Sequence, residues 1–202
     1  MVDVNESSVL PDLLKEDCIY TKCYCEENVW KLCESLACCQ QNRAFAVFIS
    51  NHNKSVPLWS QTAGDGSNNG LVIWDYHVIL LILDDSNSLI YDLDSTLPFP
   101  CPLESYISET FHPEHNLKEK FQQMLRLIPA EKYLSTFASD RSHMIKDDGS
   151  WLATPPHYPC IETSNSKMNI DKFWSMSLSG DTTYGEVYTL QKFIESFLKN
   201  SK

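Results

Sequence analysis

Long apolar segments are missing from this chain of 202 residues. The longest strongly apolar run, residues 78–83, is far shorter than the roughly 20 residues that span a bilayer. The first residues also lack a basic stretch followed by an apolar one, which is the pattern of a secretory leader. We therefore expect a soluble, unsecreted protein of the cytoplasm, with the nucleus as a further location.

Basic residues are scarce, since 16 Lys and Arg stand against 27 Asp and Glu, for a net charge of -11. Affinity for nucleic-acid phosphates comes from Lys and Arg that displace counterions. The composition therefore argues against a nucleic-acid partner, and the apolar pattern argues against a membrane partner. An acidic surface is compatible with cationic ligands such as free protein N-termini, and equally with simple solubility.

Linkers and internal repeats are lacking as well. Segments of similar composition run from about residue 18 to the C-terminus, and no Gly/Ser-rich or highly charged stretch divides them. With 43% hydrophobic residues, the chain can bury a proper core. We expect a loose N-terminal arm over residues 1–16, a single domain over residues 17–202, and a monomer.

Cysteine, in contrast, is frequent. A chain of this size with enough apolar residues for a core does not need cross-links, and no export signal takes it to an oxidising compartment. We therefore interpret most of the cysteines as free thiols. The eight are Cys18, Cys23, Cys25, Cys33, Cys38, Cys39, Cys101 and Cys160.

A zinc module built from Cys18, Cys23, Cys25 and a histidine is an alternative from another functional class. Four residues separate the first two cysteines and one separates the next two, which is not the paired-knuckle spacing of zinc sites. His112 and His115 are interpreted as exposed loop residues. We expect neither a metal nor an organic cofactor.

Hydrophobic periodicity predicts helices on either side of an antiparallel sheet, which is an α+β fold. One apolar face after Cys25 predicts a helix that begins at or next to this residue, with Glu26 and Glu27 where a helix N-terminus favours acids. Further helices are predicted at 117–128 and 190–198, and strands at 44–50, 55–59, 71–83 and 88–94, the last two as a hairpin.

Cys25 is the candidate nucleophile. A thiol becomes reactive when its thiolate is stabilised, for example by a helix N-terminus and a neighbouring imidazolium. An ordinary buried thiol is the alternative for any single cysteine. We prefer that alternative for Cys33, which lies on the inner face of the same predicted helix.

His77 lies in the middle of a predicted strand, where an imidazole needs a partner. If the hairpin loop has an even length, Asp92 and Asp94 both lie opposite His77 on its face, and either carboxylate could orient the ring. Nucleophile, base and orienting acid in the order Cys, His, Asp, with a helix before a sheet, are typical of papain-like and transglutaminase-like enzymes. A peptidase and a transglutaminase are therefore open alternatives.

The segment CYCEENVWKLCE at 23–34 resembles the opening motif of the protein N-terminal glutamine amidohydrolase family. Five more segments are similar to family segments in the same order, namely VIWDYHV at 72–78, YDLD at 91–94, LPFPC at 97–101, FASDRSHM at 137–144 and PCIET at 159–163. Blocks of this length in a fixed order are a specific signal.

The resemblance implies that Cys25 is the nucleophile, His77 the base and Asp92 the acid. It further implies that an N-terminal glutamine is converted to glutamate, with release of ammonia and through a thioester, and that the product feeds an N-end degradation pathway. Proteins or peptides with a free N-terminal glutamine would be the substrates. Asp75, which we expect on the same strand face as His77, is our candidate for binding their free amine, with a structural acid as the alternative.

Overall fold

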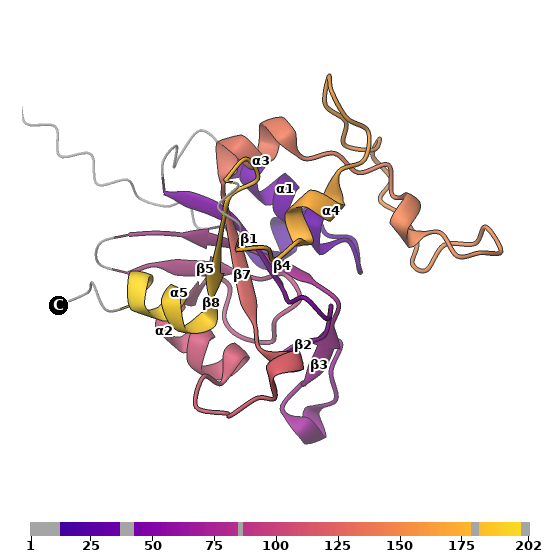
Figure 1. Ribbon diagram of the computed structural model, residues 1–202. Coiled ribbons are helices and arrows are strands. Elements are labelled where there is room, and N and C mark those ends of the chain that lie inside the picture. Colours follow the sequence, from indigo (N-terminus) through magenta and orange to yellow (C-terminus); the bar gives the residue numbers. More distant parts are fainter. Residues whose placement is uncertain (1–12, 37–42, 85–86, 179–181, 199–202) are drawn as a thin grey trace, which may run out of the picture.

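A six-stranded antiparallel sheet forms the centre of the protein (Figure 1). The computed structural model describes residues 13–36, 43–84, 87–178 and 182–198. The strands of the sheet are β1 (Ala44–Ser50), β4 (His77–Ile82), β5 (Leu89–Tyr91), β6 (Cys101–Pro102), β7 (Met124–Pro129) and β8 (Glu186–Thr189). Their order across the sheet is β6-β5-β4-β1-β7-β8. The prediction of helices around an antiparallel sheet is confirmed.

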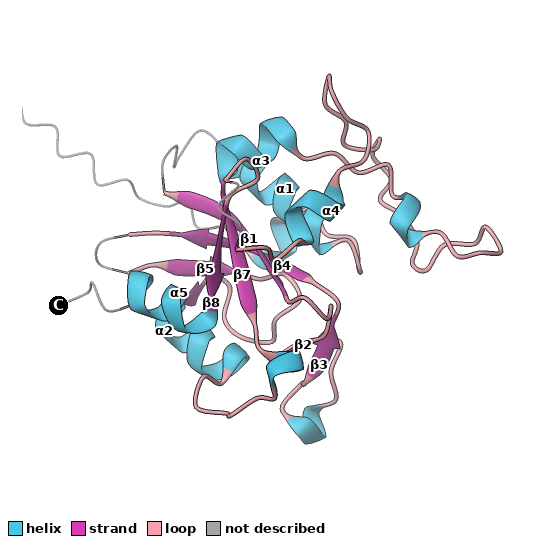
Figure 2. Ribbon diagram, in the orientation of Figure 1, coloured by secondary structure: helices cyan, strands magenta, loops and turns pink. Residues whose placement is uncertain are grey.

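Helices cover both faces of this sheet (Figure 2). On one face lie α1 (Cys25–Leu36), α3 (Ala130–Thr136) and α4 (Ile170–Trp174), and on the other lie α2 (Leu103–Tyr106) and α5 (Leu190–Phe197). Short helical turns occur at Lys15–Asp17, Gly66–Asn68, Ile107–Phe111, Glu119–Phe121 and Ser142–Met144. No helix of these described ranges has the length and apolar character needed to cross a membrane.

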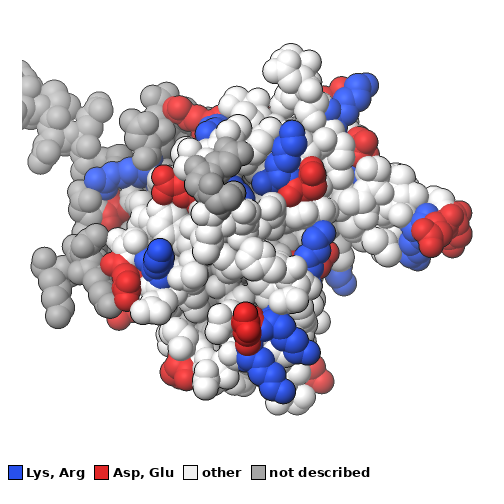
Figure 3. Space-filling view, viewed as in Figure 1, with Lys and Arg blue, Asp and Glu red and all other residues white. Residues whose placement is uncertain are grey.

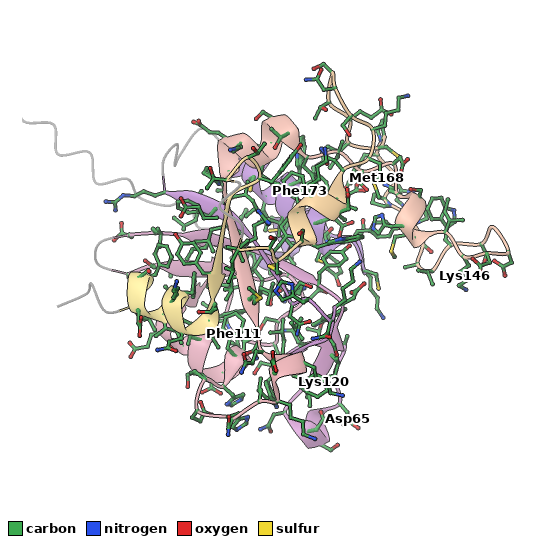
Figure 4. The ribbon with its side chains drawn as sticks, in the orientation of Figure 1. Asp65, Phe111, Lys120, Lys146, Met168 and Phe173 are labelled. Carbon is green, nitrogen blue, oxygen red and sulfur yellow. The ribbon has the colours of Figure 1, made fainter. Side chains whose placement is uncertain are left out.

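Alternation along the central strands divides the core into two apolar clusters, because successive side chains of a strand point to opposite faces. In β4, Val78 and Leu80 lie in the cluster under α1, whereas Ile79 and Leu81 lie in the cluster under α2 and α5. Phe173 of α4 is a fully buried residue of the first cluster, and Figure 4 labels it on that helix. His77 is the first residue of β4, so its ring lies where the sheet ends.

The strand expected at 71–83 is two strands in two different sheets. β3 (Val72–Trp74) pairs with β2 (Val56–Leu58), and only β4 joins the central sheet. Asp75 lies in the bend between them, where its Oδ1 accepts from the N–H of Tyr76 at 2.9 Å. This local bond competes with strand pairing. The expectation that Asp75 shares a strand with His77 is therefore wrong.

The helix expected at 117–128 is also wrong. Apart from the short turn at Glu119–Phe121, this segment enters the sheet as β7, which pairs with β1 from Met124 to Pro129. Its apolar run is buried on both faces, and such a run cannot be told from a buried helix by periodicity alone. The C-terminal helix expected at 190–198 is confirmed as α5.

Six of the eight cysteines lie in the described residues, and all six are free thiols, as expected. Cys38 and Cys39 lie outside those residues, as does most of the arm expected at 1–16. Next to that range, Lys15 donates to the carbonyl oxygen of Ser95 at 2.7 Å. Basic and acidic side chains are interspersed on the face drawn in Figure 3.

Candidate active site

Cys25 is the first residue of α1, as the sequence predicts. Its side chain is half-buried, and its Sγ donates to Oε2 of Glu26 at 3.7 Å. Burial, followed by the charges of Glu26 and Asp94, raises the pKa of the thiol well above its usual value, although the backbone N–H of Val78 lowers it. In the free protein, burial and the nearby acids therefore favour the protonated thiol over the thiolate.

His77 is paired with Asp92, and both side chains are buried. Nε2 of the ring lies 2.9 Å from Oδ1 of the carboxylate. Tyr106 donates its hydroxyl to Oδ2 at 2.8 Å, and the N–H of Asp94 donates to Oδ1 at 2.9 Å. The carboxylate is thus held from three directions, which fixes the orientation of the ring that it contacts.

The ring of His77 and its partner carboxylate shift each other's pKa in opposite directions. Burial disfavours the imidazolium, but the charge of Asp92, its hydrogen bond and the charge of Asp94 outweigh burial and raise the pKa of His77. For Asp92, burial favours the neutral acid, but His77 and the hydrogen bond from Tyr106 hold the pKa below its usual value. The surroundings of the ring therefore stabilise the imidazolium, the form that His77 takes once it has accepted a proton.

Trp74 stacks on the His77 ring, with centroids 5.5 Å apart and planes at 17°. The indole N–H donates in turn to the buried Oε1 of Gln61 at 3.2 Å. With Nε2 engaged by Asp92, the other ring nitrogen, Nδ1, is buried and has no hydrogen-bond partner. Nδ1 is thus the nitrogen left to accept a proton.

The structure brings Cys25 close to β4 but does not join its sulfur to the ring of His77. The sulfur lies within reach of the N–H of Val78, the residue after His77, and its hydrogen bond goes to Glu26. Nδ1 of His77 accepts no such bond. The sulfur, at the start of α1, thus lies near the residue that follows His77 in β4, without a direct hydrogen bond to the imidazole.

The other two acids considered from the sequence have different surroundings. Asp94 is buried and accepts a 2.6 Å hydrogen bond from the hydroxyl of Tyr20, so its carboxylate is not the one that holds the ring. Asp75 is exposed. Both carboxylates still raise the pKa of the Cys25 thiol. Several acids therefore contribute negative charge near this thiol.

Glu27, which the sequence predicted only as a helix N-terminal acid, is fully buried. It forms two 2.8 Å hydrogen bonds with Arg141, from Nε and from Nη2. Arg141 also donates to the carbonyl oxygens of Pro156 and Pro159. This ion pair ties a long irregular segment to the helix that carries Cys25. Figure 4 shows this segment extending away from the sheet, with Lys146 in its outer part.

Replacing Arg141 with methionine should destabilise the fold, because Glu27 would keep a buried charge without a partner. Breaking a buried pair in this way costs about 3–5 kcal/mol. Urea unfolding at neutral pH measures the change. Glu34→Gln breaks the exposed pair with Lys31 on the same helix and should cost at most about 1 kcal/mol. Equal losses in the two variants would contradict the structural role of the pair.

Two residues of the site were missed from the sequence. Tyr106 and Trp74 hold Asp92 and His77, respectively. Tyr106 is one of nine tyrosines and lies in none of the predicted elements. Trp74 stands three residues before His77, in the segment at 72–78 that resembles the family. An aromatic residue this close to the histidine was the one sequence feature that could have indicated a contact with the ring.

The structure does not assemble the zinc set considered above. Among the described residues, no group of three ligand atoms within 4.8 Å of one another contains a cysteine. His112, Glu114 and His115 do form such a group. The two histidines line a cavity of about 680 Å³. This cavity is not lined by Cys25, His77 or Asp92, so it does not mark the paired residues.

Comparison with known proteins gives one consistent family. The family model described as N-terminal glutamine amidase matches residues 20–197. A Danio rerio protein named protein N-terminal glutamine amidohydrolase is 50% identical over 184 residues, 89% of each chain. Proteins of the same name from Bos taurus and Homo sapiens are both 46% identical over 187 residues, 91% of this chain and 88% and 89% of theirs. The chain therefore belongs to the N-terminal glutamine amidase family.

Proposed function

We propose that this protein is an amidohydrolase that converts the N-terminal glutamine of proteins and peptides to glutamate and releases ammonia. Membership of the family supports the reaction. The observation that carries the assignment of residues is the buried His77–Asp92 pair at 2.9 Å, with a free ring nitrogen, beside the half-buried thiol of Cys25.

In the proposed mechanism, Cys25 is the nucleophile, His77 the base and Asp92 the orienting acid. The thiol turns from Glu26 toward Nδ1 of His77 and passes its proton to the ring as the sulfur attacks the carboxamide carbon. The imidazolium then protonates the departing nitrogen, which leaves as ammonia, and a thioester remains. Asp92 stabilises the imidazolium without taking its proton.

Water completes the reaction. His77 takes a proton from the water as its oxygen attacks the thioester carbon, and the thiolate leaves and regains the proton. The product is an N-terminal glutamate. The protonated thiol and the raised pKa of His77 fit a proton transfer that takes place on substrate binding, instead of a thiolate formed beforehand.

The backbone N–H of Cys25 is the proposed first donor to the oxyanion. At the first residue of α1 it belongs to the N–H groups that have no acceptor within the helix. Loss of one such donor typically costs about 10²- to 10³-fold in rate.

The proposal extends to the fold class and the cellular role. A helix that starts at the nucleophile and packs on an antiparallel sheet with the base and acid supports a papain-like or transglutaminase-like arrangement, within one catalytic domain over residues 17–202.

We further propose a monomer in the cytoplasm and nucleus that needs no cofactor. Its product carries an N-terminal glutamate, which an arginyl-transferase can extend, so the enzyme feeds an N-end degradation pathway. Asp75, whose charge acts on Cys25, is a candidate substrate contact.

Three matched peptides test the reaction: one with glutamine first, one with glutamine second, and one with an acetylated N-terminal glutamine. The first should release ammonia rapidly and gain the mass expected for glutamate. A site built around a polar group rejects analogues that lack it by about 10⁴-fold, so the other two should react at least about 10²-fold more slowly. Equal rates for the free and acetylated peptides would refute the N-terminal specificity. Cleavage of the chain would instead favour a peptidase, and conjugation to an added amine a transglutaminase.

A further inference from the structure

Glu26 is a fully buried acid with unused hydrogen-bonding capacity next to the thiol. Its Oε2 accepts from the hydroxyl of Tyr76 at 3.0 Å and from Cys25 at 3.7 Å. Its Oε1 is closed to solvent and has no hydrogen-bond partner, and the nearest cationic candidate is Nε2 of His143 at 3.5 Å. Leaving a buried carboxylate oxygen unpaired is costly, so a ligand that donates to it would recover this cost.

The charges around the thiol are complementary to a cation. Glu26, Asp94 and Asp75 all act on Cys25 as negative groups. The arginine on the neighbouring segment, Arg141, is already held by Glu27. The surroundings of the proposed nucleophile therefore carry an excess of negative charge, which a neutral carboxamide would not balance.

We propose that Oε1 of Glu26 binds the α-ammonium group of the substrate's N-terminal glutamine, an inference that rests on the proposed function. In glutamine, four bonds separate the α-nitrogen from the carboxamide carbon, so these atoms lie at most roughly 5 Å apart. Sγ of Cys25 lies 3.7 Å from Oε2 of Glu26, the other oxygen of the same carboxylate. One glutamine can therefore present its carboxamide carbon to the sulfur and its ammonium to the carboxylate.

Oε1 is closed to solvent and the imidazole of His143 is next to it, so the proposal requires this ring to move aside to admit the ammonium. Neutralising Glu26 also removes one of the charges that raise the pKa of Cys25. Binding of the correct N-terminus thus makes the thiol a better proton donor to His77. An acetylated or internal glutamine carries no ammonium and leaves the thiol as it is.

Glu26 is a better candidate than Asp75 on the same physical grounds. Asp75 is exposed, and its Oδ1 already accepts from the N–H of Tyr76. Ion pairs with exposed carboxylates are weak because water screens them. A contact at Asp75 would discriminate poorly between a free and a blocked terminus.

The test compares two substrates in the whole chain of 202 residues. One is a peptide with N-terminal glutamine, and the other is the same peptide with a 4-carbamoylbutanoyl group in place of glutamine, which removes only the α-amine. In Glu26→Gln, kcat/KM for the first should fall by about 10- to 150-fold, as expected for a lost charge-assisted hydrogen bond. The kcat/KM for the amine-free analogue, measured at high enzyme concentration, should not fall.

Glu34→Gln, an exposed acid on the same helix, serves as the matched control and should leave both values unchanged. Should Glu26→Gln fail to fold, Tyr76→Phe keeps the carboxylate but removes the hydroxyl that holds it, and should raise KM for the amine-bearing peptide alone.

Two results would overturn the inference: a preference for the amine that is unchanged in folded Glu26→Gln, including the case of equal losses on both substrates, or loss of the preference in Asp75→Asn instead. Ammonia release by the unaltered protein from the glutamine peptide tests the proposed function separately. If that protein releases none, the function itself fails, whatever the variants do.

Discussion

Replacing Cys25 with alanine is expected to abolish ammonia release from a peptide with N-terminal glutamine. Removal of the nucleophile of a catalytic triad costs about 10⁶-fold in kcat, because no other group forms the acyl intermediate. The fold should survive, since the half-buried thiol makes one long hydrogen bond to Glu26 and otherwise lies within reach of one backbone N–H, that of Val78. Ammonia release and thermal unfolding, recorded on the same preparation, measure the two effects.

Cys23→Ala is the matched control for this variant. Cys23 lies two residues before Cys25, outside α1, and is exposed. It should keep substantial activity. An inactive Cys23→Ala together with an active Cys25→Ala would show that the nucleophile has been assigned to the wrong cysteine.

Asp92→Asn is expected to lower kcat by about 10⁴-fold, as the loss of an orienting acid does in other triads. An asparagine keeps much of the shape but cannot stabilise the imidazolium. The charge of Asp92 raises the pKa of His77 against the effect of burial. Its removal therefore lowers that pKa, so the acid limb of the residual kcat/KM profile should move to lower pH.

Asp94→Asn provides the comparison, since Asp94 is also buried and also raises the pKa of His77. Its carboxylate accepts from Tyr20 instead of holding the ring, so its loss should be much milder. Equal losses in the two variants would mean that the orienting role is shared. An acid limb that stays in place in Asp92→Asn would argue that this carboxylate does not act on His77.

The sequence indicates which residues can pair with His77, because successive side chains of a strand alternate between the two faces of a sheet. In the observed register Leu80 opposes Tyr91, so odd-numbered residues of β4 oppose even-numbered ones, as predicted. Periodicity alone left Asp92 and Asp94 equivalent. The difference lies in the bend after β5, where the N–H of Asp94 donates back to Asp92, and such a bend cannot be derived from alternation.

Other features depend on tertiary contacts that leave no local pattern. The break at Asp75 divides one apolar segment between two sheets. The run at Met124–Pro129 is buried on both faces and therefore has neither helical nor alternating character. Burial of Glu26 and Glu27 contradicts their ordinary preference for solvent, and it is explained only by Tyr76 and Arg141, which come from distant parts of the chain.

The central claim is that the thiol of Cys25 is activated by the ring of His77, and labelling tests it most directly. A peptide whose first residue carries a chloromethyl ketone in place of the glutamine carboxamide would be incubated with the protein, and the modified cysteine located by mass spectrometry. Cys25 alone should be labelled, and His77→Ala should slow the labelling severely. Labelling of another cysteine, or of Cys25 at an unchanged rate in His77→Ala, would contradict it.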